Sequence, residues 1–258
     1  MNSQPTQPTT DATQATTLLP LLYAMDQDHG WAQGMRAITH ALLAQCSLIQ
    51  GPLLELGCGS GTFLQELADR HPDQTCIGLD RNGVALTYAN RRAATSQLTQ
   101  ADLQQLPFAD NYFALIVALD VFDQRFVQLA EALQESWRIL QPGGALLLRI
   151  SAHPWLHSTH DAAFNTGRRY ARQEVVAAIN ASAFDLERVT FANTLLSPPV
   201  ILQRLLERGR VLPFASNHDI SPAVNQLVAQ ALYAEARLLS HINLPFGISL
   251  YVLARKRL

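Results

Sequence analysis

The feature that most constrains this chain is a turn with three alternating glycines, Gly57, Gly59 and Gly61, which directly follows an apolar run over residues 52–56. A helical pattern of apolar residues begins immediately after the turn. Strand, glycine turn and helix in this order are typical of the first unit of a doubly wound α/β sheet. In such a sheet ligands lie outside the carboxyl ends of the strands, where glycine lets the backbone come close because it has no Cβ. The turn therefore predicts both a fold class and the place of a binding site.

The same alternation continues to residue 150. Thr62 and Gln65 have the spacing of a capping box, and the helix that they open ends before His71 and Pro72. Alternating strands and helices require a mostly parallel sheet that is covered by helices on both faces. We therefore expect a Rossmann-like, doubly wound, mostly parallel seven-stranded α/β sheet. Its expected strands up to this point are 52–56, 75–79, 97–101, 113–119 and 145–150, and the expected helices are 62–70, 82–93 and one that carries Leu129, Leu133, Trp137 and Leu140 and ends at 141–144.

The pattern loosens beyond residue 150, where a polar loop with several histidines runs to about residue 170. More than fifty residues separate the last two expected strands, and a structureless loop of that length is implausible inside a compact domain. We therefore predict a helical insertion over residues 194–247 that acts as a lid or as a subunit contact. The elements expected here are a helix over 172–183, strands over 186–191 and 248–255, and, inside the insertion, helices over 200–208 and 221–241 with a proline-containing break at 211–214.

The helices of the insertion carry apolar stripes. Such stripes must pack on the core of the domain, on a second subunit or on an apolar substrate, and the sequence leaves these three partners open. A homodimer is therefore one of the expected arrangements. The stripe residues are Val200, Ile201, Leu205, Leu227, Leu232 and Leu239.

The segment before the first strand divides into two parts. Residues 1–18 are rich in Thr, Gln and Pro and lack the basic start and apolar run of a signal peptide, so they are predicted to be a disordered tail. Apolar residues recur at helical spacing from residue 21 to residue 45, and N-terminal cap helices are expected over residues 19–50. We thus expect one domain over residues 19–258, with a cofactor-binding core at 51–150.

Composition narrows the range of partners. A net charge of −2 and 16% charged residues provide no basic face for nucleic acid, so a small-molecule or peptide partner is expected. The three cysteines, Cys46, Cys58 and Cys76, have no short metal-type spacing, which argues against a metal site and a disulfide framework and favours a cytoplasmic location. No apolar run reaches the roughly 18 residues of a transmembrane segment.

The glycine turn has features that favour a nucleoside cofactor with a cationic end. Asp80 ends the second expected strand, where a carboxylate can accept hydrogen bonds from both ribose hydroxyls. A dinucleotide turn would have Gly or Ala at the sixth position, which is Thr62 here. The carboxylate of Glu55 would repel a pyrophosphate but suits the amino group of a methionine moiety. These charges favour S-adenosylmethionine over a dinucleotide.

Five segments in order resemble the class I S-adenosylmethionine-dependent methyltransferases, and most closely their type-11 domain: LLELGCGSGTFL, IGLD, QADLQQLPFAD, FALIVALDVFD and LQESWRILQPGGALLLRI. The resemblance covers about residues 50 to 150. It implies S-adenosyl-L-methionine as the cofactor, with contacts at the methionine end, the ribose, the adenine and the sulfonium. The implied cofactor residues are Glu55, Gly57, Cys58, Gly59, Gly61, Asp80, Arg81, Asp102, Leu103 and Leu119, where Arg81 stacks on adenine or is solvated.

A second resemblance lies beyond this core. HPWLHSTHD followed by RRYARQEVVAAI is similar to a bacterial subset of type-11 methyltransferases with an HD…RRY stretch and a PFG segment before the last strand, and DHGWAQGMR resembles its N-terminal segment except for Gly30 and Ala32. The candidate substrate contacts are Trp31, Asp120, His153, Asp161, Arg168, Arg169 and Tyr170. Histidine can remove a proton from a hydroxyl during transfer. His157 and His160 are therefore the candidates for a base or for orienting the acceptor.

The sequence thus predicts methyl transfer to an oxygen or nitrogen atom, and less readily to carbon, of a small molecule or a peptide or natural-product acceptor. The acceptor itself is left open, because the fold is shared by many substrates. The alternative is a non-catalytic subunit that binds S-adenosylmethionine and uses the insertion as a partner surface. A nicotinamide dehydrogenase is the third reading.

Overall fold

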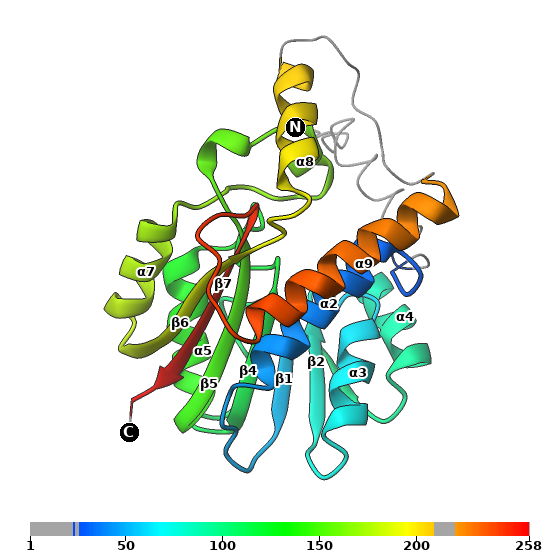
Figure 1. The fold of residues 1–258 in the computed structure, drawn as a ribbon. Helices are drawn as coiled ribbons and strands as arrows, with labels where there is room; N and C mark the ends of the chain where they lie inside the picture. The colour runs from blue at the N-terminus through cyan, green and yellow to red at the C-terminus, as the bar shows by residue number, and fades with distance from the viewer. Residues whose placement is uncertain (1–22, 24–25, 209–219, 258) are drawn as a thin grey trace, which may run out of the picture.

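A twisted seven-stranded sheet forms the centre of the molecule in the computed structural model, which describes residue 23 and residues 26–208 and 220–257 (Figure 1). The strand order is β3-β2-β1-β4-β5-β7-β6, with neighbours parallel except for β7, which runs antiparallel to β5 and β6. The expected fold class is confirmed. The strands are β1 Leu53–Leu56, β2 Cys76–Asp80, β3 Gln97–Gln100, β4 Phe113–Leu119, β5 Leu140–Ser151, β6 Phe184–Ala192 and β7 Ser249–Lys256.

Helices cover both faces of the sheet, as a parallel sheet with apolar residues on both sides requires. One buried cluster contains side chains of α5 and α7, and the other contains side chains of α2, α3 and α9. The strand order reverses between β1 and β4, which is where a doubly wound sheet opens its ligand crevice. The helices are α2 Gly30–Leu43, α3 Thr62–Arg70, α4 Gly83–Arg92, α5 Leu129–Ile139, α6 Thr159–Ala163, α7 Arg172–Ala181, α8 Ser197–Arg208 and α9 Pro222–Leu239.

Two local expectations are wrong. Thr62 does not cap α3, because Gly61 occupies the N-cap position with φ +79° and Thr62 is already helical. The Thr62 hydroxyl instead contacts the Ser60 hydroxyl at 2.9 Å and accepts a hydrogen bond from Arg92 at 3.1 Å. Residues 141–144 do not close a helix either. They belong to β5, whose pairing with β4 shifts register between Phe113 and Leu115.

The two described helices of the insertion have different surroundings. α9 packs along α2 (Figure 1), where Gly34 makes room for Leu232 and the Gly30 amide donates to Asn225 Oδ1 at 2.7 Å. Leu232 and Leu239 of the predicted stripe are fully buried and belong to the core, whereas Leu227 is exposed. α8 projects beyond the sheet and keeps Leu205 exposed. The predicted tail at 1–18 and the break at 211–214 lie outside the described residues.

Candidate active site

The three glycines of the turn all have left-handed backbones, with φ +71°, +51° and +79° at Gly57, Gly59 and Gly61. A Cβ on Gly57 would lie 2.7 Å from Val121, and one on Gly61 would lie 2.7 Å from the backbone of Ala89. A Cβ on Gly59 would have no neighbour closer than 3.6 Å. Gly57 and Gly61 are therefore required for packing, whereas Gly59 leaves an open approach to the backbone.

Asp80 ties the end of β2 to this turn. Its Oδ2 accepts a hydrogen bond from the Gly59 amide at 2.9 Å, and its Oδ1 accepts one from the Asn82 amide at 2.8 Å. Burial raises the pKa of Asp80, although these two bonds oppose the shift. Each carboxylate oxygen can accept a second hydrogen bond. Asp80 can therefore hold the turn and bind a hydroxyl pair at the same time.

Glu55 lies at the carboxyl end of β1 and is only 3% exposed. Its Oε2 has no hydrogen-bond partner among the residues that the structure describes. Burial, together with the negative charges of Asp26 and Asp80, raises its pKa well above the ordinary value. A buried carboxyl group without a partner is costly, so this site is suited to a ligand that brings a cation or a donor.

A buried arginine that the sequence analysis did not identify lies beside this group. Arg149 lies near the carboxyl end of β5, forms an ion pair with Asp120 at 2.6 Å and lies 5.6 Å from the ring centre of Trp31. The sequence signal that could have identified it is a single cationic residue near the end of an otherwise apolar strand. The structure thus joins Trp31 and Asp120, which are distant in sequence, through Arg149.

The predicted adenine contacts lie on the other side of the crevice. Asp102 is exposed and accepts a hydrogen bond from the Gln104 amide at 3.0 Å, while Leu103 is buried. The guanidinium of Arg81 lies 4.9 Å from the ring centre of Phe126. Arg81 was predicted either to stack on adenine or to be solvated, and the structure adds Phe126 as a stacking partner. Cys58 is buried, and burial raises the pKa of its thiol, which argues against a nucleophile.

Two residues that precede α2, Tyr23 and Asp26, contact the turn. Tyr23 is the nearest neighbour of the open side of Gly59, and its ring lies 5.7 Å from that of Tyr88. Asp26 accepts a hydrogen bond from the Ser60 hydroxyl at 2.7 Å. Sequence reasoning missed Tyr23 and Asp26, because nothing in their spacing connects them to the turn.

Asp161 is the centre of a buried ion cluster in the loop after β5. It is 1% exposed and pairs with Arg169 at 2.7 Å and with Arg204 of α8 at 3.0 Å. Although burial opposes ionisation, the hydrogen bonds from Arg169 hold the pKa of Asp161 below its ordinary value. The HD…RRY residues Asp161 and Arg169 therefore fasten α8 to this loop, and their contact with a substrate stays a prediction.

The other predicted residues of this loop have various surroundings. Arg168 pairs with Glu174, and its guanidinium lies 4.8 Å from the ring centre of Tyr170. His157 is exposed, and the side chain of His160 lies outside the description. His153 stacks on two phenylalanines at the carboxyl edge of the sheet. Leu119 ends β4, at the switch point where the cofactor prediction places it.

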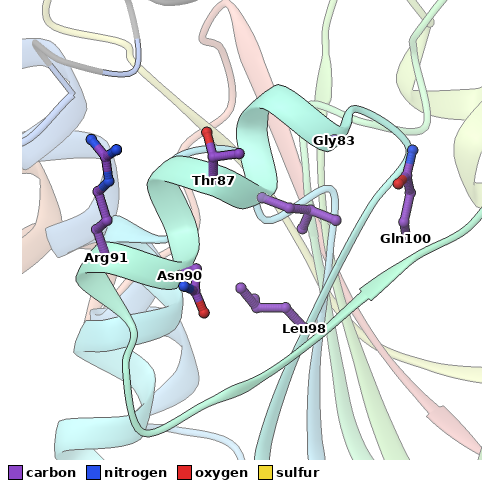
Figure 2. A pocket seen from close by; sticks show the side chains of 7 residues that line it. Gly83, Thr87, Asn90, Arg91, Leu98 and Gln100 are labelled. Atoms are coloured by element: carbon purple, nitrogen blue, oxygen red, sulfur yellow. The ribbon is translucent and has the colours of Figure 1, made fainter.

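An open hollow of about 490 Å³ lies between α4 and the edge strand β3 (Figure 2). Its lining includes none of the predicted cofactor residues. This hollow is therefore separate from the predicted cofactor site at the glycine turn. The lining residues are Gly83, Leu86, Thr87, Asn90, Arg91, Leu98 and Gln100. Within residues 26–208 and 220–257, no helix is long and apolar enough to cross a membrane, and no group of three His, Cys, Asp or Glu side chains is arranged to hold a metal ion.

Comparison with known proteins connects this geometry to a family. Residues 54–148 match the family described as "Methyltransferase domain". The chain is 29% identical over 137 residues to a demethylmenaquinone methyltransferase of Deinococcus radiodurans, covering 51% of this chain and 53% of that protein. It is 32% identical over 138 residues to malonyl-[acyl-carrier protein] O-methyltransferase 1 of Coxiella burnetii, covering 52% and 46%. The chain thus spans about half the length of these curated relatives.

A solved structure extends the likeness of fold over nearly the whole chain. Geranyl diphosphate C-methyltransferase from Streptomyces coelicolor, in complex with Mg²⁺, geranyl diphosphate and S-adenosyl-L-homocysteine, superposes with a TM-score of 0.57 at 16% identity, covering 99% of this chain and 88% of that one. Residues 54–148 are therefore similar to a methyltransferase domain, and the chain shares the Rossmann-like fold of this solved methyltransferase.

Proposed function

We propose that this protein is an S-adenosylmethionine-dependent methyltransferase that acts on an oxygen or nitrogen atom of a small molecule or of a peptide or natural-product acceptor. The observation that carries the proposal is the Glu55 carboxyl group, which is buried, lacks a partner at Oε2 and lies directly before the glycine turn. A ligand with an ammonium group at this point would supply the missing donor.

The residues of the turn fit the cofactor in three places. Glu55 would bind the amino group of the methionine moiety, the open side of Gly59 would admit the ligand to the backbone, and Asp80 would accept the ribose hydroxyls. Asp102 and Leu103 would border the adenine, and Leu119 would face the reacting centre. When bound, the cofactor supplies an electrophilic methyl group on a sulfonium.

The chain's own contribution to the reaction is alignment and exclusion of water. In-line displacement needs the acceptor atom behind the methyl group, so positioning provides most of the rate enhancement. Arg149 forms an ion pair with Asp120 at the end of β4, and its guanidinium lies near the ring of Trp31. His157 and His160 stay predictions as bases.

The names of the relatives do not define one chemical class of acceptor. Their names refer to demethylmenaquinone and to malonyl-[acyl-carrier protein], which are chemically unlike each other. The predicted non-catalytic subunit is not favoured, because the relatives that this chain matches are named as methyltransferases.

The test is calorimetric titration with S-adenosylhomocysteine over a pH series, with NAD as the comparison ligand. We expect a micromolar dissociation constant for S-adenosylhomocysteine, none measurable for NAD, and an affinity that rises with pH as Glu55 ionises. Glu55→Gln should weaken binding and remove this pH dependence, whereas Glu131→Gln on α5 should change neither. Preferential binding of NAD would overturn the assignment, and an unchanged Glu55→Gln profile would remove Glu55 from it.

A further inference from the structure

Three non-glycine residues with left-handed backbones follow three strands at the carboxyl edge of the sheet. They are Asp120 after β4, His153 after β5 and Asn193 after β6, with φ of +54°, +64° and +61°. Such conformations cost free energy and persist where the surrounding structure imposes them, which is common at binding sites. The row continues from the cofactor crevice toward β6, on the side where an acceptor would enter.

His153 is held in this row by aromatic rings. Its imidazole is nearly parallel to the ring of Phe191, with centres 5.2 Å apart, and it stacks on Phe246 at 4.8 Å. The ring centre of Trp155 lies 5.7 Å from that of His153, with the two rings tilted. Trp155 and Phe246 remain 46% and 36% exposed, so the cluster keeps a solvent-facing aromatic surface.

The hydrogen bond of His153 fixes its tautomer. Nε2 lies 3.0 Å from the carbonyl oxygen of Gly247, which can only accept, so Nε2 carries the proton. Burial lowers the pKa of His153, and the charge of Arg169 adds to this effect. The ring is therefore neutral near pH 7, and Nδ1 presents a lone pair that has no partner in the described part of the chain.

The charges around the cluster are already paired. Arg169 and Arg204 both bind Asp161, and Arg168 binds Glu174. The residues that pack on His153 from β6 and from the loop before β7, Phe191, Phe246 and Gly247, have no titratable side chains. A neutral acceptor thus suits this surface better than a carboxylate or a phosphate.

We propose that His153, Phe191, Phe246 and Trp155 form the acceptor subsite, which binds a planar hydroxylated ring and uses Nδ1 of His153 to receive the proton of its hydroxyl group. This inference rests on the proposed methyltransferase function. In the transfer, the hydroxyl oxygen forms a C–O bond to the methyl carbon and the S–CH₃ bond breaks, with its electron pair going to sulfur. The hydroxyl proton moves to Nδ1 and is then released to water.

The first experiment observes His153 directly by ¹⁵N NMR of its side chain, with 2-naphthol as the probe and 2-methylnaphthalene and decanoate as comparisons. The spectra are recorded with and without S-adenosylhomocysteine. We expect the Nε2–H tautomer, a pKa below that of an ordinary histidine, and a shift of Nδ1 on addition of 2-naphthol only. An Nδ1–H tautomer, or an Nδ1 chemical shift that does not change on addition of 2-naphthol, would overturn the inference.

The second experiment measures methyl transfer to 2-naphthol. His153→Gln can still donate to the Gly247 carbonyl and offer an acceptor oxygen, but it cannot take the proton. We expect its rate to fall by about 10²-fold or more, with a Michaelis constant for 2-naphthol within a few fold of the wild-type value. The acidic limb of the pH–rate profile should disappear. His241→Gln, at the end of α9, serves as the matched control.

The two proposals can fail separately. One outcome is that S-adenosylhomocysteine binds normally to the wild type and to His153→Gln, but the wild type does not methylate 2-naphthol. The proposed acceptor subsite would then be wrong, while the proposed function would stand. If His153→Gln keeps the wild-type rate and pH profile, His153 is not the proton acceptor. Loss of thermal stability in His153→Gln together with a raised Michaelis constant and an unchanged pH profile would indicate a purely structural role.

Discussion

The two halves of the carboxyl edge are built on different principles. The half formed by β1, β2 and the glycine turn uses backbone groups of one short segment and the carboxyl groups at the ends of two adjacent strands, as in the hydrogen bond from the Gly59 amide to Asp80. The half formed by the ends of β5 and β6 and by α8 depends on side chains from separate elements, as in the pairing of Asp161 with Arg169 and Arg204. A local motif can thus encode the first half, whereas the second exists only after folding.

The largest expected effect tests the first half at Gly59. Gly59→Val should abolish measurable binding of S-adenosylhomocysteine, because the branched side chain occupies the open approach and disfavours φ +51°. Calorimetry and far-UV circular dichroism check binding and folding. Gly83→Ala is the control, since its Cβ would meet only the Gln100 side chain at 3.5 Å. Normal binding by Gly59→Val would mean that the turn is not the cofactor site.

The second half should respond most strongly at Asp161. Asp161→Ala leaves two buried arginines without their partner, so we expect a loss of about 3–5 kcal/mol in the free energy of unfolding. Urea denaturation measures this loss, and calorimetry on the folded fraction should show unchanged affinity for S-adenosylhomocysteine. Asp185→Ala, which breaks an exposed pair with Arg257, should cost no more than about 1 kcal/mol. Equal losses for the two variants would contradict the buried cluster.

Asp123 should make the second half sensitive to pH. Burial, with the nearby charge of Asp120, raises its pKa to about 6, while its Oδ2 accepts a hydrogen bond from the Ser151 amide at 2.8 Å. The folded state therefore holds the proton more tightly than the unfolded state, and stability is lost as pH rises from about 4 to about 6. The shift corresponds to about 3 kcal/mol.

Asp123→Asn provides the measurement of this dependence. The variant keeps an acceptor for Ser151 but cannot ionise, so its melting temperature relative to wild type should rise between about pH 4 and pH 6 and then level off. Scanning calorimetry in matched buffers records the difference. A constant difference across this range would show that Asp123 does not titrate in it.

The smallest expected effect is at Asp80. Asp80→Ala removes the acceptor for the ribose hydroxyls and for two backbone amides, so affinity for S-adenosylhomocysteine should fall by about 1.5–3 kcal/mol, or tenfold or more. Asp102→Ala, at an exposed carboxylate, should cost less. If the two variants lose equal affinity for S-adenosylhomocysteine, Asp80 is not the residue that binds the ribose hydroxyls.

The strands and the turn were predictable because their signals are local. β4 has the predicted bounds 113–119, and Ser221 caps α9 as its Ser-Pro start indicated. Side-chain periodicity and turn chemistry act over a few residues, so one sequence is enough to read them. Thr62 was misassigned because the left-handed conformation of Gly61 took the capping position.

The sequence by itself determined the sheet, the glycine turn and the carboxylates Glu55 and Asp80, because each of these follows from residues that are neighbours along the chain. Only the tertiary structure decided that α9 packs on α2, that Arg149 joins Trp31 to Asp120, and that Arg204 reaches Asp161 from 43 residues away. Those contacts join residues that are far apart in the sequence, and the same amino-acid composition is compatible with many other pairings of charged and apolar side chains. The physical reason is that burial selects partners by position in space, which periodicity does not encode.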